Sequence, residues 1–202
     1  MIRPLLIAAA IATLATLSGC ATTASAPRSS AAVAAYQDNI ELAGGIFISY
    51  TRDGKREPLN GSFTWRQTKS TTDVSLISPT GQTVAVINVT PRAATLTEGG
   101  KRPQTAPDLD TLTAQTLGWT LPVSGLRDWL QGYATDRDGK RFVASPANDN
   151  VITRDGWKLE YVSWQDETAA VPRPKRIDAT RIVLGEAVDD MQIRIVIRPQ
   201  QQ

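Results

Sequence analysis

The chain has 202 residues, with 22 Lys and Arg against 20 Asp and Glu, one Cys and no His. The absence of His excludes Ser-His-Asp triads and His-ligated metal sites, and a single thiol cannot close a disulfide within the chain. A formal charge of +2 offers no concentrated basic face of the kind that nucleic-acid binding requires. The apolar fraction of 41% supports the core of one large domain or two small ones. No catalytic residue, metal site or cofactor is predicted.

Residues 1–19 have the features of a signal peptide. A basic Arg3 precedes the apolar stretch Leu5–Leu17, whose 13 residues are well short of the roughly 20 that span a bilayer. The Leu-Ser-Gly-Cys sequence that ends at Cys20 resembles the bacterial lipobox, in which the Cys thiol receives a diacylglyceryl group. We therefore expect cleavage before Cys20 and lipid attachment at Cys20. The alternative is an ordinary secretory signal followed by a chance Cys.

The residues after Cys20 indicate a cellular location and a flexible tether. In enteric-type lipoprotein sorting an Asp at the next position favours retention in the inner membrane, and this chain has Ala21. The predicted location is therefore the outer membrane, with the domain facing the periplasm. Residues 21–35 are rich in Ala, Ser and Thr without apolar periodicity, which is typical of a flexible tether. The predicted organisation is a cleaved segment 1–19, a lipidated tether 20–40 and a single domain 41–202.

The first half of the domain reads as antiparallel strands. Asp53-Gly54 lies between the first two strands, in a loop that we expect to be longer than a tight hairpin. Pro79-Thr80-Gly81 predicts a tight turn between the third and fourth strands. The predicted strands are Gly45–Thr51, Leu59–Gln67, Asp73–Ser78, Gln82–Thr90 and Ala93–Thr97.

Two short helices and four more strands complete the pattern. The apolar spacing predicts helices over Asp108–Leu117, stopped by Gly118, and over Pro122–Gln131, stopped by Gly132. The later strands are Val151–Arg154, Trp157–Trp164, Arg176–Leu184 and Met191–Arg198, with Trp157, Leu159, Tyr161, Ile193, Ile195 and Ile197 facing inward. The chain is therefore predicted to be an α+β domain. A curved antiparallel sheet would carry the helices on its concave face and enclose an apolar interior.

An ordered set of motifs resembles the LolB family of outer-membrane lipoprotein receptors. The block Leu-Pro-Val followed by Leu-x-x-Trp-x-x-Gly is the most distinctive, and the resemblance covers nearly all of the chain after Cys20. It implies an incomplete β-barrel with a short helical lid over a hydrophobic cavity, the fold of LolA and LolB. After the lipobox, the motifs are Phe63-Thr-Trp65-Arg-Gln67, Ser78-Pro-Thr-Gly81, Gly118-Trp-Thr-Leu-Pro-Val123, Leu126-Arg-Asp-Trp-Leu-Gln-Gly132, Gly156-Trp-Lys-Leu-Glu-Tyr161 and a Pro-x-Pro before the last strands.

The resemblance also implies a function. LolB-like proteins receive lipoproteins from LolA, a soluble periplasmic carrier, hold the acyl chains of the cargo in the cavity, and release the cargo into the outer membrane without a nucleotide. A cavity that is better for lipid than the carrier's and worse than a bilayer would give the transfer its direction. The expected partners are a LolA-like carrier, the cargo's acyl chains and the outer membrane, which the protein contacts through its own lipid. The protein is expected to act as a monomer.

The resemblance assigns roles to particular residues. The membrane-insertion loop is Pro79, Thr80 and Gly81; family members typically carry a bulky apolar residue at this tip, and Thr80 departs from that pattern. A neighbour such as Ile77 could substitute, or the receptor could insert weakly or have specialised. Each cavity candidate could equally be ordinary core, because a lipid pocket and a packed core use the same residue types. The candidates for the acyl-chain cavity are Phe63, Trp65, Trp119, Leu121, Leu126, Trp129 and Trp157.

Three other functions remain open from the residues alone. An anchored lipoprotein that binds small hydrophobic ligands or free lipid would share the anchor, the sheet and the cavity. An enzyme could use paired carboxylates such as Asp108 with Asp110 or Asp189 with Asp190, although such residues are usually solvated or cap helices. A purely structural lipoprotein is the third.

Overall fold

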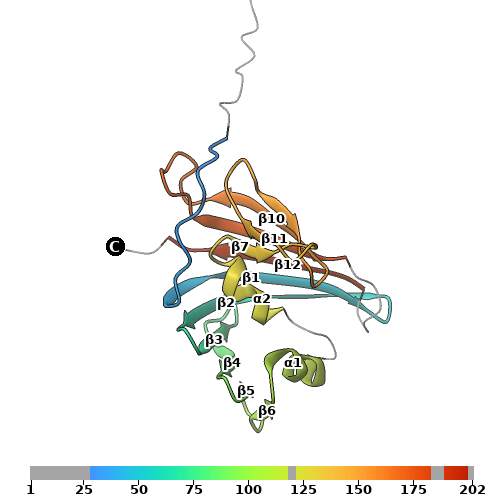
Figure 1. Cartoon of the computed structure of the whole chain (residues 1–202). Helices are drawn as coiled ribbons and strands as arrows, with labels where there is room; N and C mark the ends of the chain where they lie inside the picture. The colour runs from blue at the N-terminus through green and yellow to red at the C-terminus, as the bar shows by residue number, and fades with distance from the viewer. Residues whose placement is uncertain (1–27, 118–121, 183–188, 200–202) are drawn as a thin grey trace, which may run out of the picture.

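The structure, a computed structural model, describes residues 28–117, 122–182 and 189–199. Ten strands form one antiparallel sheet in the order β6-β5-β4-β3-β2-β1-β12-β11-β10-β9, which curls around the two helices without pairing its end strands (Figure 1). In the part of the chain described, no helix has the length and apolar character to cross a membrane. The elements are β1 (Ile40–Arg52), β2 (Lys55–Gln67), β3 (Thr72–Ile77), β4 (Thr83–Val89), β5 (Ala94–Glu98), β6 (Gln104–Ala106), α1 (Leu109–Leu117), α2 (Val123–Trp129), β7 (Tyr133–Thr135), β8 (Arg141–Val143), β9 (Asn150–Ile152), β10 (Trp157–Trp164), β11 (Pro174–Arg181) and β12 (Asp189–Ile197).

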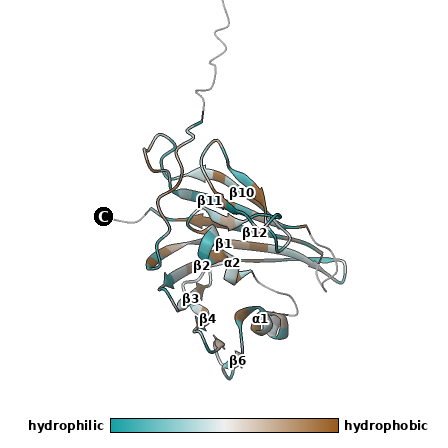
Figure 2. Ribbon diagram, viewed as in Figure 1, coloured by the Kyte–Doolittle hydropathy of each residue, from teal (hydrophilic) through white to brown (hydrophobic). Residues whose placement is uncertain are grey.

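Apolar side chains alternate with polar ones along the strands (Figure 2), and they cover the concave face. Ile195 of β12 lies between Ile46 of β1 and Ile177 of β11 in the register of the sheet. The inward-facing positions predicted for the last strands and for β10 are confirmed, since all six side chains are buried. The predicted fold is likewise what the strand order shows: a curved, open antiparallel sheet with two helices on its concave side.

The β1–β2 hairpin is tighter than its sequence suggested. Pairing continues through Arg52 and Lys55, so that Asp53 and Gly54 form a two-residue turn with φ values of 50° and 72°. Two positive φ values match the turn whose twist suits antiparallel strands. The expectation of a longer loop was wrong because the polar residues between the two apolar runs continue the backbone ladder, which needs no apolar side chains.

Residues 28–39, named the strap below, pack on the domain upstream of the predicted boundary at Glu41. The backbone N–H of Ala147 donates to Ser29 O (2.9 Å), and that of Val33 donates to Ala144 O (3.2 Å). Arg28 forms an ion pair with Asp149 at 2.5 Å. The packed unit therefore begins before residue 41. The remainder of the predicted tether, together with Cys20, lies outside the described residues.

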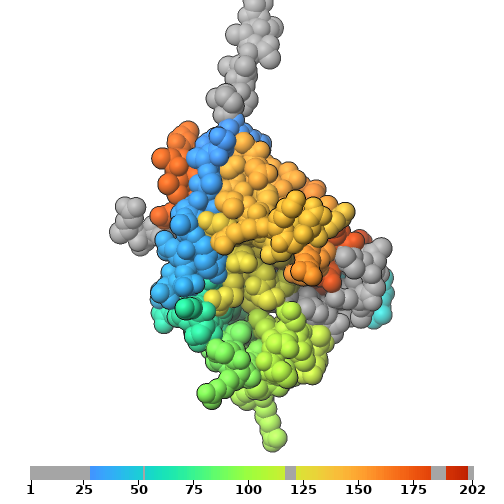
Figure 3. All heavy atoms as spheres, in the orientation of Figure 1, coloured from blue at the N-terminus to red at the C-terminus, as the bar shows by residue number. Residues whose placement is uncertain are grey.

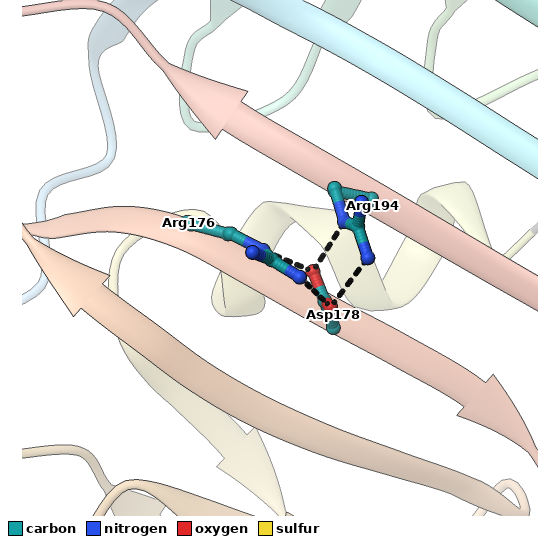
Figure 4. Close-up of polar contacts among 3 residues, drawn as sticks. All are labelled: Arg176, Asp178 and Arg194. Carbon is teal, nitrogen blue, oxygen red and sulfur yellow. Dashed lines mark hydrogen bonds and ion pairs between the residues drawn. The ribbon is translucent and has the colours of Figure 1, made fainter.

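The convex face of the sheet carries a cluster of charges across β11 and β12 (Figure 4). The Asp178 carboxylate accepts hydrogen bonds from Arg176 Nε (2.9 Å) and Arg194 Nε (3.2 Å), and further bonds from the same two guanidinium groups. Burial would raise the pKa of Asp178, but the hydrogen bonds from Arg176 and Arg194 outweigh it and leave the pKa below its ordinary value. The cluster therefore links two neighbouring strands through charge-assisted hydrogen bonds.

Candidate functional site

The concave face of the sheet and helix α2 enclose a small cavity whose lining is entirely apolar. Its volume is about 40 Å³. Side chains of β1, β2, β3, β4 and β12 form one wall, and side chains of α2 and the residue after it form the other. The lining residues are Ile46, Ile48, Leu59, Phe63, Trp65, Val74, Leu76, Ile87, Val123, Leu126, Leu130 and Ile195.

The structure divides the predicted cavity residues into two groups. Phe63, Trp65 and Leu126 line the cavity. Trp129 and Trp157 are as deeply buried, but they lie outside the lining and pack on each other with their ring centroids 5.9 Å apart. The remaining two candidates, Trp119 and Leu121, fall outside the described residues.

Two groups of packed aromatic rings lie beside the cavity. Trp129 and Trp157 pack at a centroid separation of 5.9 Å with their planes tilted by 59°. Tyr161 stacks between Phe142 and Trp164, at 6.3 Å and 5.9 Å. They fill the space between α2, the β7–β8 hairpin and β10. The Tyr161 hydroxyl donates to Trp129 O at 3.3 Å, and burial raises the pKa of Tyr161 far above its ordinary value. The space between α2 and strands β1–β4 and β12 is left unfilled.

The sequence analysis missed most of the lining residues on the sheet. Ile46 and Ile48 of β1, and Val74 and Ile87 of the next strands, were treated only as strand residues. Their alternation with outward-facing neighbours is a usable signal for the concave face. Nothing in that alternation shows which part of the concave face the helices leave uncovered, because the packing of helix on sheet brings together residues far apart in sequence.

The cavity is too small to hold an acyl chain in this conformation. A volume of 40 Å³ is close to the roughly 30 Å³ that one water occupies, whereas pockets for drug-sized ligands have roughly 300–1,000 Å³. Leu59 lines the cavity and is nevertheless 45% exposed, so the mouth lies near the start of β2. This space would have to widen before it could hold an acyl chain.

Helix α1 covers the sheet beyond the cavity, with Leu109 and Leu112 buried. Asp108 caps it: Thr111 N–H donates to Asp108 Oδ1 at 2.7 Å and the Thr111 hydroxyl donates to Asp108 Oδ2 at 2.8 Å, which lowers the pKa of Asp108. Burial, and then the nearby Asp108 charge, raises the pKa of Asp110. Both oxygens of Asp108 bind Thr111 at the helix start, so Asp108 is a structural cap.

The predicted insertion loop is the turn between β3 and β4. Gly81 has a φ of 86°, its N–H donates to Ser78 O at 2.9 Å, and the predicted tight turn is confirmed. Pro79, Thr80 and Gly81 are all exposed, and the Thr80 hydroxyl lies 2.8 Å from that of Ser78. The tip therefore presents a small polar side chain. Ile77 lies within β3 and is partly buried.

A family model described as "Outer membrane lipoprotein LolB" matches residues 39–199. The chain belongs to the LolB family. An outer-membrane lipoprotein LolB of Cupriavidus necator is 38% identical over 160 residues, which cover 79% of each chain. Another, of Thiobacillus denitrificans, is 33% identical over 175 residues and covers 86% of this chain and 89% of its own. A LolA superfamily protein from Nitrosomonas europaea covers 83% of this chain and 87% of its own, with 10% identity and a TM-score of 0.46.

The residues that match the LolB family model include the lining of the cavity. The match begins at residue 39, where the strap ends, and includes β1–β12 and both helices. The cavity therefore lies within the part of the chain that the family model matches, whereas residues 28–38 of the strap precede that match.

Proposed function

We propose that this protein is an outer-membrane receptor that takes lipoproteins from a LolA-like periplasmic carrier and inserts them into the outer membrane. The observation that carries the proposal is an apolar cavity between the concave face of the sheet and helix α2 in a chain of the LolB family. The acyl chains of the cargo would occupy that cavity after the lid opens. The protein itself is held at the outer membrane by the lipid on Cys20.

An apolar lining suits the transfer of acyl chains. Each CH₂ group removed from water contributes roughly 0.8 kcal/mol, so exposing a whole acyl chain between carrier and receptor would be strongly unfavourable. Direct passage from the carrier's cavity into this one avoids that exposure. Since every lining residue is apolar, the cavity offers no directional bonds, and the chain can leave again for a bilayer.

The experiment that tests the function is a transfer assay. Purified carrier loaded with a lipoprotein is mixed with the domain made as a Cys20→Ser variant, and the cargo is followed from one protein to the other. We expect nearly complete transfer to the receptor without any nucleotide. Absence of transfer would overturn the proposal. Binding of free fatty acid without transfer would favour an anchored lipoprotein that binds small hydrophobic ligands.

The polar tip of the β3–β4 turn predicts weak insertion. Thr80→Leu should speed the release of cargo into liposomes about fivefold, because partial burial of a Leu side chain in the bilayer interface contributes about 1 kcal/mol. The measurement is the rate at which cargo appears in the liposome fraction.

Ser70→Leu is the matched control for Thr80→Leu. Ser70 is an exposed, uncharged residue in the β2–β3 turn, at the opposite end of β3, and only its backbone N–H is hydrogen-bonded to Thr68. The control should leave the rate unchanged. Equal release rates for Thr80→Leu and the unmodified protein would show that the loop tip plays no part in the insertion step.

A further inference from the structure

The strap contacts the chain just after helix α2. The Gln131 side chain pairs with the backbone of Gln37: its Oε1 accepts from Gln37 N–H at 2.9 Å, and its Nε2 donates to Gln37 O at 3.0 Å. The Tyr133 hydroxyl donates to Ala34 O at 2.6 Å. Figure 3 shows the strap, in blue, lying against the yellow and amber atoms of this region. The segment nearest the lipid is thereby joined to the end of the lid helix.

Val33 of the strap also packs closely against Gly132. Val33 is only 8% exposed, and a Cβ added at Gly132 would lie 2.7 Å from Val33 Cγ1. Gly132 has a φ of 85° and directly follows the last hydrogen-bonded turn of α2. Its carbonyl accepts from Ala144 N–H, and Ala144 O accepts in turn from Val33 N–H. Glycine is needed here both to end the helix and to let the strap approach it.

The same end of α2 is held from its other side by Arg127. Its guanidinium donates to Thr68 O (2.7 Å), to Thr71 O (3.0 Å) and to the Thr72 hydroxyl, all in or beside the β2–β3 turn. By contrast, the N-terminal end of α2 has no side-chain capping hydrogen bond, and the Ser124 hydroxyl in its first turn donates to Asp110 Oδ1 of α1 at 3.4 Å. Among the described residues, side-chain hydrogen bonds therefore join the C-terminal end of α2 to the sheet and its N-terminal end to α1.

A second path joins the strap to the cavity wall. Gln67 Nε2 donates to the Tyr36 hydroxyl at 2.9 Å, and Trp65 Nε1 donates to Gln67 Oε1 at 3.2 Å. Gln67 is almost fully buried, and Trp65 lines the cavity. A displaced strap would consequently leave a buried amide short of a partner beside the cavity.

We propose that the strap is a positioning element of the acyl-chain site, in which Val33 and Gln37 hold the C-terminal end of α2 while α1 and the N-terminal end of α2 move to open the cavity. The proposal rests on the proposed function, since it concerns the loading of the same cavity. The strap then helps to position the acyl-chain site, in addition to connecting the domain to its lipid anchor.

The test compares strap variants of the otherwise whole Cys20→Ser domain, with a fluorescent long-chain fatty acid as the probe. Val33→Asp places a charge in the contact with Gly132 and leaves residues 39–199, which the family model matches, unchanged. We expect the probe to dissociate about tenfold faster, and the backbone amides of Leu130 and Gly132 to exchange with solvent at least tenfold faster. Val33→Ile, which keeps an apolar side chain at this position, should have the probe dissociation rate and the amide exchange rates of the unmodified domain. Stopped-flow fluorescence and hydrogen exchange measure them.

Ile177→Val is the matched control for a general loss of stability. Ile177 is fully buried in β11 and lies neither in the cavity lining nor in contact with the strap's hydrogen bonds. It should leave probe dissociation unchanged. The proposal would be overturned if the probe dissociation rate and the amide exchange rates of Val33→Asp stayed within twofold of those of the unmodified domain. It would also be overturned if Ile177→Val accelerated them equally. A domain that bound no probe and took no cargo would overturn the proposed function instead, and the exchange rates would still decide whether the strap holds α2.

Discussion

Val74→Glu is expected to lower the affinity of the domain for acyl chains about 100-fold, or about 2.8 kcal/mol at 1.4 kcal/mol per factor of ten. Val74 is buried on the concave face, pairs with Trp65 and Ile87 on the neighbouring strands, and lines the cavity. A carboxylate in an apolar space either remains charged at a large desolvation cost or becomes protonated and still lacks a hydrogen-bond partner. The same variant should lose the ability to take cargo from the carrier.

Ser75→Glu is the control for that change. Ser75 is the next residue of β3 and therefore faces the convex side, away from the cavity. It carries the same new charge and should bind acyl chains normally. Fatty-acid titration of both variants, with circular dichroism to confirm that each is folded, separates a blocked cavity from a lost fold. Normal binding by folded Val74→Glu would contradict the assignment of the cavity.

Gly44→Ala is expected to destabilise the domain by about 3 kcal/mol, which corresponds to a melting temperature about 6–12 °C lower for a chain of this size. An added Cβ would lie 2.2 Å from the carbonyl oxygen of Val196 and 2.8 Å from Cε1 of Phe63. The first of these atoms belongs to the backbone and cannot move aside without shifting β12. The second belongs to a cavity-lining ring, so acyl binding should also weaken.

Gly45→Ala tests whether the effect comes from this close approach. Its added Cβ would find only Gly61 O, at 3.9 Å, which is an ordinary contact. Because glycine within a strand is unfavourable, this variant should be neutral or slightly stabilising. Thermal unfolding of the two variants side by side measures the difference. Equal losses of stability would show that the curl of the sheet at β1 and β12 does not depend on the missing side chain at residue 44.

Much of the sheet could be predicted from local pattern. Alternating apolar residues located nearly every long strand, and Asp155-Gly156 located the β9–β10 turn. The three-residue strands β6, β7 and β8 escaped prediction because they contain little alternation, whereas the equally short β9 was located by the turn that follows it. The strap escaped for a different reason: its Ala- and Ser-rich composition is typical of a tether, and its order comes from contacts with residues about 100 positions away.

The candidate site was predicted in kind and only partly in detail. The resemblance to the LolB family placed aromatic residues around the cavity, and Phe63 and Trp65 do line it. Trp129 and Trp157 instead fill the neighbouring space by packing on each other. The distinction between a wall and a filled core depends on how α2 lies across the sheet, which no single segment encodes.

The alternatives named from the sequence fare differently. Asp108 is a poor candidate for a catalytic carboxylate, because its two oxygens cap α1. Binding of free hydrophobic ligands uses the same cavity, and the chain's membership of the LolB family favours lipoprotein transfer. A purely structural lipoprotein gives no reason for a wholly apolar cavity with an exposed Leu59 at its mouth.

The sequence by itself determined the family, the antiparallel strands and the side of each strand that faces the core, because backbone alternation and short motifs are local properties of the chain. Only the tertiary structure decided where the core remains unfilled, which end of α2 is held, and that the strap belongs to the domain. Each of these depends on contacts such as Val33 with Gly132 or Arg127 with Thr68, whose partners meet only when the sheet has curled around its helices. The physical reason is that periodicity specifies the face a residue presents, whereas packing specifies what it meets there.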